Sequence, residues 1–211
     1  MTNATAFYVY DALCGWCYGF GPVIRQFALK YADRVPVEVL SGGMIQGSRI
    51  EPIAAMADYI RQASPRVAQT TGVTFGDAFY REILDKGTYI SNSLPPAVAL
   101  AILKQAKPLG QVTLAHDIQK QLYLEGRDLN EAETYLPLAA GAGISENDFR
   151  TKFNSEEYRT KAVQEFGLVQ SWGISGFPAV VLQKEDQLYL VARGYQPYEE
   201  FTQTIDKVLA G

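Results

Sequence analysis

Two cysteines three residues apart, in the segment Cys14-Gly-Trp-Cys17, constrain the fold of this chain more than any other feature. They are its only cysteines, and they follow a short run typical of a β-strand, residues 6–10. After them apolar side chains recur at helical spacing, at Phe20, Ile24, Phe27, Ala28 and Tyr31. A second strand-like run, residues 37–40, is stopped by a Gly-Gly pair at 42–43. The order of strand, helix and strand predicts a parallel β-α-β unit, with the cysteines where the first strand passes into the helix.

The spacing of the two cysteines suits redox chemistry. Residues i and i+3 are neighbours in the first turn of a helix, so two thiols placed there can close a disulfide. Cys14 is expected at the helix N-terminus, where free backbone N–H groups and the helix dipole favour its thiolate. We therefore expect Cys14 to be an exposed nucleophile that forms a mixed disulfide. Cys17, one turn in and more buried, is expected to be the thiol that resolves it.

Two other interpretations of the cysteine pair compete with this one. A structural zinc site takes four ligands, and the chain has a single histidine, His116, and no second cysteine pair. Two cysteines buried only for packing remain an alternative, because a free cysteine behaves as a small hydrophobic residue. Gly15 and the strand-to-helix junction favour redox chemistry instead. His116 lies beside Asp117 in a helical segment, and we expect a surface histidine there rather than a catalytic base.

Composition and charge exclude several classes of function. The chain has 211 residues, 47% of them hydrophobic and 20% charged, as in a globular protein with an ample core. Its 19 basic and 23 acidic residues give a net charge of −4 and are mixed along the sequence, without the basic stripe that nucleic-acid binding requires. The apolar runs are too short for a transmembrane helix. The N-terminus lacks the basic region of a signal peptide, so we expect a cytoplasmic protein with neither nucleic-acid nor membrane partners.

The middle of the chain differs from both ends. From about residue 51 to 153 its pattern predicts five or six helices and no strand. Pro52 and Pro65 are expected in first helical turns, and Gly72 at a helix end. Ser145 is expected to begin a helix as part of a capping box.

The C-terminal part returns to mixed α/β structure. Ser155 is expected to cap a helix that runs towards Trp172. Residues 178–182 and 188–191 are predicted to pair as a hairpin, and residues 198–209 to form an amphipathic helix. A proline that enters a strand, as Pro178 does here, commonly lies at an edge or a bend.

With Cys14-Gly-Trp-Cys17, the helical middle and the Gly-Phe-Pro178 segment, the chain resembles the DsbA-like branch of the thioredoxin superfamily. Its nearest likeness there is to the cytoplasmic proteins described as predicted protein-disulfide isomerases. The resemblance implies an α/β thioredoxin fold built from residues 1–50 and 155–211. It implies an inserted all-helical domain over residues 51–154.

The same resemblance implies a set of site residues. Cys14 and Cys17 would exchange thiols, while Phe177 and Pro178 hold an extended substrate backbone beside them. Gly15 and Trp16 complete the motif and would also contact substrate. In the family the bond before this proline is cis, and the residues alone leave open whether the Phe177–Pro178 bond is cis.

The implied activity is that of a thiol–disulfide oxidoreductase or isomerase acting on the disulfides of proteins or small thiols. The electrons stay in the cysteine pair, so no cofactor is needed, and glutathione is one available reductant. The periplasmic oxidant of the family has a histidine between its cysteines. Gly15 and Trp16 lack that contribution, so a weaker oxidant is expected. Substrate, redox partner, direction of electron flow and oligomeric state stay open.

Two further functions stay open as alternatives. Kappa-class glutathione transferases and 2-hydroxychromene-2-carboxylate isomerases look similar, with an inserted helical domain and glutathione as cofactor. They carry a serine near the position of Cys14 and need no second cysteine, so Cys17 argues against them. The other alternative is a non-enzymatic peptide-binding module, which would keep a peptide-binding cleft and would not depend on Cys14.

Overall fold

A computed structural model describes residues 4–211 of the chain. Residues 1–3 lie outside the described residues. The predicted domain segment 1–50 and the expectation that no signal peptide is present both include them. No helix within residues 4–211 is long and apolar enough to cross a membrane.

A four-stranded mixed sheet forms the centre of the molecule, with the strand order β2-β1-β5-β6. Its strands are β1 (Ala4–Tyr10), β2 (Val37–Ser41), β5 (Ala179–Lys184) and β6 (Gln187–Arg193). β1 runs parallel to β2 and antiparallel to β5, and β6 pairs antiparallel with β5. The predicted parallel unit and the predicted hairpin are therefore confirmed.

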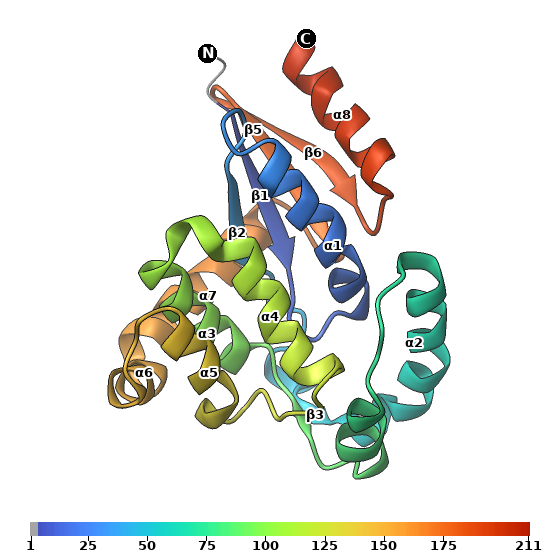
Figure 1. Cartoon of the computed structure of the whole chain (residues 1–211), viewed down its shortest axis with the longest axis vertical. Coiled ribbons are helices and arrows are strands. Elements are labelled where there is room, and N and C mark those ends of the chain that lie inside the picture. Colours follow the sequence, from blue (N-terminus) through green and yellow to red (C-terminus); the bar gives the residue numbers. More distant parts are fainter. Residues whose placement is uncertain (1–3) are drawn as a thin grey trace.

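Alternation along β1 gives the sheet two buried faces. Tyr8 faces α1 (Gly15–Lys30), where its ring lies 5.9 Å from that of Phe20. Phe20 in turn packs against Phe201 of α8 (Tyr198–Ala210) at 5.5 Å between ring centroids. On the opposite face Val9 packs in a cluster with Val169 of α7 (Glu156–Ser171). The sheet thus lies between α1 with α8 on one side and α7 on the other (Figure 1).

The segment between β2 and α7 is mainly helical and gathers at the end of the sheet where β1 ends, with α2 to one side (Figure 1). Its α-helices are α2 (Ala57–Thr71), α3 (Leu94–Ala106), α4 (Gln111–Tyr123), α5 (Leu136–Gly141) and α6 (Glu146–Phe153). Shorter turns of 3₁₀ helix are η1 (Gly47–Arg49), η2 (Ile53–Met56), η4 (Pro108–Gly110) and η5 (Ala132–Tyr135), and η3 (Phe79–Asp85) is a π-helix.

Two details of this helical segment differ from the sequence prediction. It contains two short antiparallel strands, β3 (Glu51–Pro52) and β4 (Ile90–Ser91), so the expectation of no strand is wrong. Pro52 lies in β3 and not in a helical turn, as a strand in a two-stranded ribbon has an unpaired edge that tolerates a missing N–H. Pro65 lies inside α2, because no breaker precedes it and the helix begins earlier, at Ala57.

The predicted helix ends are mostly confirmed. Gly72 follows α2 with φ +78, a left-handed conformation that glycine adopts readily. The Ser145 hydroxyl accepts the Asp148 N–H at 3.2 Å, and the Ser155 hydroxyl accepts the Tyr158 N–H at 3.4 Å. These side chains satisfy N–H groups that the helix itself leaves free.

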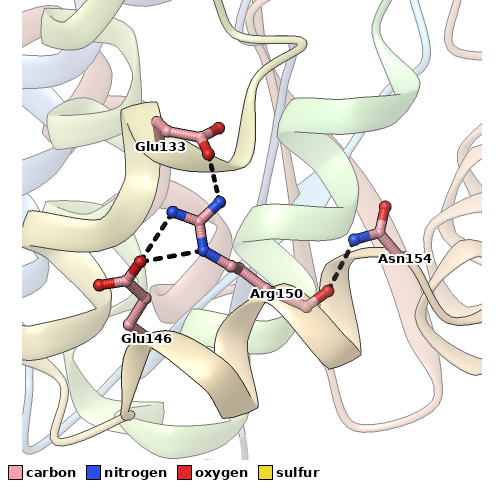
Figure 2. Close-up of polar contacts among 4 residues, drawn as sticks. All are labelled: Glu133, Glu146, Arg150 and Asn154. Carbon is pink, nitrogen blue, oxygen red and sulfur yellow. Dashed lines mark hydrogen bonds and ion pairs between the residues drawn. The ribbon is translucent and has the colours of Figure 1, made fainter.

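One ion-pair cluster on the surface connects η5 with α6 (Figure 2). The Arg150 guanidinium pairs with Glu133 of η5 and donates to Glu146 one turn earlier in α6, at 2.8 Å. The Arg150 carbonyl accepts the Asn154 side-chain N–H at 2.9 Å near the end of the same helix. All three charged side chains are at least 36% exposed, so the cluster contributes little to stability.

Candidate active site around Cys14 and Cys17

The two cysteines lie at the N-terminus of α1, as predicted. Cys14 is the N-cap residue, and its Sγ accepts the backbone N–H of Cys17 at 3.3 Å. Both thiols are free. Cys14 is 7% exposed and Cys17 0%. Cys17 is the more buried of the two, as predicted, whereas the prediction of an exposed Cys14 is wrong. The segment after α7 contacts the Cys14 thiol through the Phe177 carbonyl and covers it on that side.

That covering segment contains Phe177 and Pro178, and the peptide bond between them is cis. The Cys14 thiol donates to the Phe177 carbonyl at 3.6 Å. The Phe177 ring lies against Gly42, where an added Cβ would meet the ring at 2.1 Å. Cys14 and Phe177 are far apart in the sequence, and they are in contact as the resemblance implies.

Burial determines the protonation of the inner cysteine. Tyr8 donates its hydroxyl to the Cys17 carbonyl at 3.3 Å, and the Cys17 side chain has no exposed surface. Burial, reinforced by the neighbouring Cys14, raises the pKa of Cys17 well above its usual value. Cys17 is therefore a neutral thiol at physiological pH.

Asp11 positions the turn before the cysteines, a role that sequence reasoning missed. Its carboxylate accepts the backbone N–H of Leu13 at 2.9 Å and that of Met44 at 2.7 Å. Its carbonyl accepts the Cys14 N–H at 3.1 Å and the side-chain N–H of Gln119 in α4, also at 3.1 Å. Burial raises the pKa of Asp11 despite these bonds. The available signal was an acidic residue directly after an apolar strand.

The remaining motif residues flank the cysteines on the outer side. Gly15 begins α1, and the half-buried Trp16 lies with its ring centroid 6.3 Å from that of Tyr195, which follows β6. Trp16 therefore bridges from the motif to the C-terminal part of the chain.

The prediction that His116 lies at the surface is wrong. His116 is 8% exposed, and its ring stacks on Tyr18 of α1 at 5.4 Å between centroids. A Cβ on Gly21 would lie 2.3 Å from His116 Nδ1, so the glycine makes room for the imidazole. Burial lowers the pKa of His116 to about 4. Asp117 is only partly buried on α4, while His116, one position earlier, faces α1.

A cavity of about 240 Å³ opens beside Cys14. Leu13, Cys14, Gly15 and Trp16 form one wall, and residues 44–123 supply the others. Aromatic rings pack beneath it, with Tyr123 5.1 Å from Tyr18 and 5.3 Å from Phe75 between centroids. The charged residues of its lining are Arg49 and Glu51, both exposed.

The geometry does not point to a metal centre. Within residues 4–211 no three His, Cys, Asp or Glu side chains gather in an arrangement that could hold a metal ion. The reactive groups on the described part of the chain are two thiols at a helix N-terminus, a donor set suited to disulfide exchange.

Comparison with solved structures gives relatives of the same architecture. A candidate protein disulfide isomerase from Nitrosomonas europaea is 26% identical, with a TM-score of 0.85 and 98% of each chain covered. The cytosolic disulfide reductase DsbM from Pseudomonas aeruginosa is 26% identical, with a TM-score of 0.80, 98% of this chain and 100% of that chain covered. A structure of that reductase with GSH is also similar, at 25% identity, a TM-score of 0.76, and 98% and 100% coverage.

A 2-hydroxychromene-2-carboxylate isomerase is more distant. It is 11% identical, with a TM-score of 0.63, 98% of this chain and 94% of that chain covered, and this likeness shows the fold alone. No curated protein sequence matches the chain.

The family profile agrees with the fold. The profile of the DSBA-like thioredoxin domain matches residues 7–206, nearly the whole chain. The chain therefore belongs to the DSBA-like thioredoxin family, with a thioredoxin fold that carries a helical insertion.

Proposed function

We propose that this protein reduces or rearranges disulfides, with Cys14 as the attacking nucleophile and Cys17 as the resolving thiol. One observation carries the proposal: Cys14 Sγ caps α1, where it accepts the Cys17 N–H at 3.3 Å. Helix N-terminal N–H groups stabilise a thiolate, which is the reactive form in disulfide exchange.

The exchange proceeds in two balanced steps. The Cys14 thiolate attacks one sulfur of a substrate disulfide, the substrate S–S bond breaks, and one substrate thiolate leaves. The buried Cys17 thiol then passes its proton to the substrate thiolate released in the first step, and its sulfur attacks Cys14 Sγ. The second substrate thiolate leaves. The substrate has then gained two electrons, and the cysteine pair has lost them and forms the Cys14–Cys17 disulfide. Run in reverse, the same steps oxidise a dithiol, and isomerisation combines both directions.

Residues around the thiols would align the substrate. The Phe177 carbonyl lies 3.6 Å from Cys14 Sγ, so a substrate backbone passing Phe177 and Pro178 would bring its sulfur to the nucleophile. Gly15 and Trp16 lie beside it on the outer side of α1. Asp11, through the Cys14 N–H, is a positioning residue.

A small thiol is the natural source of electrons for such a protein. Support for glutathione in this role comes from the related reductase that has a structure with GSH. The cytosolic description of that relative supports a cytoplasmic location here as well. The chemistry needs no further cofactor, because the cysteine pair itself stores the electrons.

A trapping experiment tests the assignment of the two cysteines. Reduced Cys17→Ser protein, mixed with oxidised glutathione, is expected to gain the mass of one glutathionyl group on Cys14, since the resolving step is blocked. Wild-type protein is expected to form the internal disulfide without a lasting adduct. Intact-mass and peptide mass spectrometry measure both products.

The matched variant Cys14→Ser is the control, and no adduct is expected on its buried Cys17. Equal adduct formation on Cys14→Ser would contradict the assigned order of attack. A glutathione-dependent isomerase activity that survives Cys17→Ser would instead favour the related isomerases. Activities that all survive Cys14→Ala would favour a peptide-binding module.

A further inference from the structure

The cavity beside Cys14 lies away from the segment that covers the thiol on its other side. Its lining includes Cys14 itself, and neither Phe177 nor Pro178 belongs to it. The Cys14 thiol therefore contacts the Phe177 carbonyl and also lines the cavity. A disulfide also has two halves, so one can lie along the Phe177 segment while the other enters the cavity.

The buried part of the cavity wall is mostly apolar, and its polar groups include the Ser64 hydroxyl, which is hydrogen-bonded to Tyr80, and the Tyr89 hydroxyl. Ile53 and Val67 are 5% and 2% exposed, and Phe79 is 1% exposed. The charged lining residues, Arg49 and Glu51, are exposed at its edge. A charged group inside would lose its water without meeting a charged partner, since Arg49 and Glu51 lie at the edge, whereas an apolar group would be favoured.

Part of the cavity's exposed edge is apolar as well. Met56 and Tyr59 both line the cavity, and they are 46% and 63% exposed. A substrate bound in the cavity would cover these exposed apolar side chains.

The size of the cavity limits its occupant. A volume of about 240 Å³ lies below the roughly 300–1,000 Å³ of pockets that hold drug-sized ligands. One ring or one branched aliphatic group fits, and a folded polypeptide segment does not.

We propose that this cavity is a specificity pocket for the apolar half of a low-molecular-weight disulfide, an aromatic or branched aliphatic group bonded to the sulfur that Cys14 attacks. The proposal rests on the proposed function and adds its substrate class. The Cys14 thiolate attacks the sulfur that bears the apolar group, and the polar thiolate leaves. Cys17 then releases the apolar thiolate as the Cys14–Cys17 disulfide closes.

Two probes of matched chemistry test this inference: the mixed disulfides of glutathione with benzyl mercaptan and with 2-mercaptoethanol. Their reduction by pre-reduced wild-type protein is measured in single turnover and divided by the rate with dithiothreitol. We expect at least about a tenfold preference for the benzyl compound, the discrimination an apolar pocket typically provides. Reduced Cys17→Ser protein is expected to trap the benzylthio adduct and not the glutathionyl one.

Variants of α2 localise the effect. Ala63 lines the cavity, and Ala63→Phe is expected to fill it and abolish the preference. The control Gln69→Phe introduces the same side chain at an exposed position of the same helix, outside the lining, and is expected to keep the preference. Ile60→Ala enlarges the cavity and should shift the preference towards a naphthylmethyl analogue, which keeps the test decisive if Ala63→Phe fails to fold.

The outcomes separate the two proposals. Reduction of both probes at equal normalised rates would overturn the pocket and leave the proposed function intact. Reduction of neither probe, together with no trapped adduct, would overturn both. A preference confined to peptide disulfides with an aromatic residue beside the cysteine would overturn the low-molecular-weight substrate and assign the cavity to protein side chains.

Discussion

At position 42 any side chain would collide with the Phe177 ring, because a Cβ there would lie 2.1 Å from it. Gly42→Ala is therefore expected to displace Phe177, whose carbonyl accepts the Cys14 thiol. We expect the free energy of unfolding to fall by about 2 kcal/mol through overpacking. The rate at which Cys14 forms a mixed disulfide should fall about tenfold, since a misplaced group beside the reacting atom is costly. Denaturant unfolding and rapid-mixing kinetics measure the two effects.

A second glycine supplies the control for this substitution. Gly167 lies in α7, and a Cβ added there meets no other atom within 4 Å. Gly167→Ala should raise the free energy of unfolding by about 0.5–1 kcal/mol and leave exchange unchanged, because alanine is favoured in a helix interior. Unaltered exchange kinetics in Gly42→Ala would show that the Phe177 contact does not position the site.

His116 predicts a pH dependence of stability. Burial lowers its pKa from 6.5 to about 4, so between these values the unfolded chain binds a proton that the folded chain does not. The free energy of unfolding should therefore fall as pH falls from about 6.5 to about 4, with a contribution of about 3 kcal/mol. Denaturant titrations across this range measure it. His116→Gln should flatten this part of the profile, and an unchanged slope in that variant would contradict the assignment.

The roles of some single residues could be predicted from the sequence, and the roles of others could not. Cys14 and Cys17 were predictable because their spacing and local context suffice for the chemistry. Gly42 was expected only to end a strand, and Asp11 was assigned no role at the site, since each acts on chain segments far away in the sequence, Phe177 and Met44. The wrong prediction for His116 has the same cause: only the fold brings Gly21 against it.

At the scale of elements, one ion pair connects α3 and α7 to strand β2 of the sheet. Lys104 of α3 pairs with Glu165 of α7, and both side chains are largely buried. Lys104 also donates to the Val39 carbonyl at 2.9 Å, while Glu165 accepts the Ser41 N–H at 2.9 Å, both in β2. The pair thus joins two helices to one strand.

Lys104→Met should lower the free energy of unfolding by about 2 kcal/mol, because it removes charged hydrogen bonds and leaves the Glu165 carboxylate without its cation. Glu165→Gln keeps an acceptor for Ser41 and removes the charge. A double-mutant cycle with both changes measures the coupling. If the double variant loses the sum of the two single losses, the pair does not act as a unit.

Elements with local signals were the most predictable. Residue pattern predicted the four strands of the main sheet, β1, β2, β5 and β6. Serines at the N-termini of α6 and α7 predicted where these two helices begin. The strands β3 and β4 escaped prediction because each is two residues long and is defined only by its pairing partner. Pro65 was misplaced because a proline does not always mark a helix start.

At the scale of the whole molecule, the sheet places three distant segments around one sulfur atom. β1 leads into Cys14, the chain before β5 brings Phe177 over it, and the helical segment walls the cavity beside it. The overall architecture followed from the motif and from the resemblance it supports. The cavity did not, because its lining comes from side chains spread over residues 13–123.

The most direct test of the central claim is the redox titration of the Cys14–Cys17 pair in glutathione buffers. Trp16 lies between the two cysteines, and replacing the other tryptophan with Trp172→Phe makes its fluorescence the only tryptophan signal. We predict one reversible two-electron transition that disappears in Cys14→Ala and in Cys17→Ala. A midpoint of about −270 mV would indicate a reductase, and one of about −120 to −180 mV an oxidant or isomerase. The absence of any reversible two-electron transition in the wild-type protein would contradict the account.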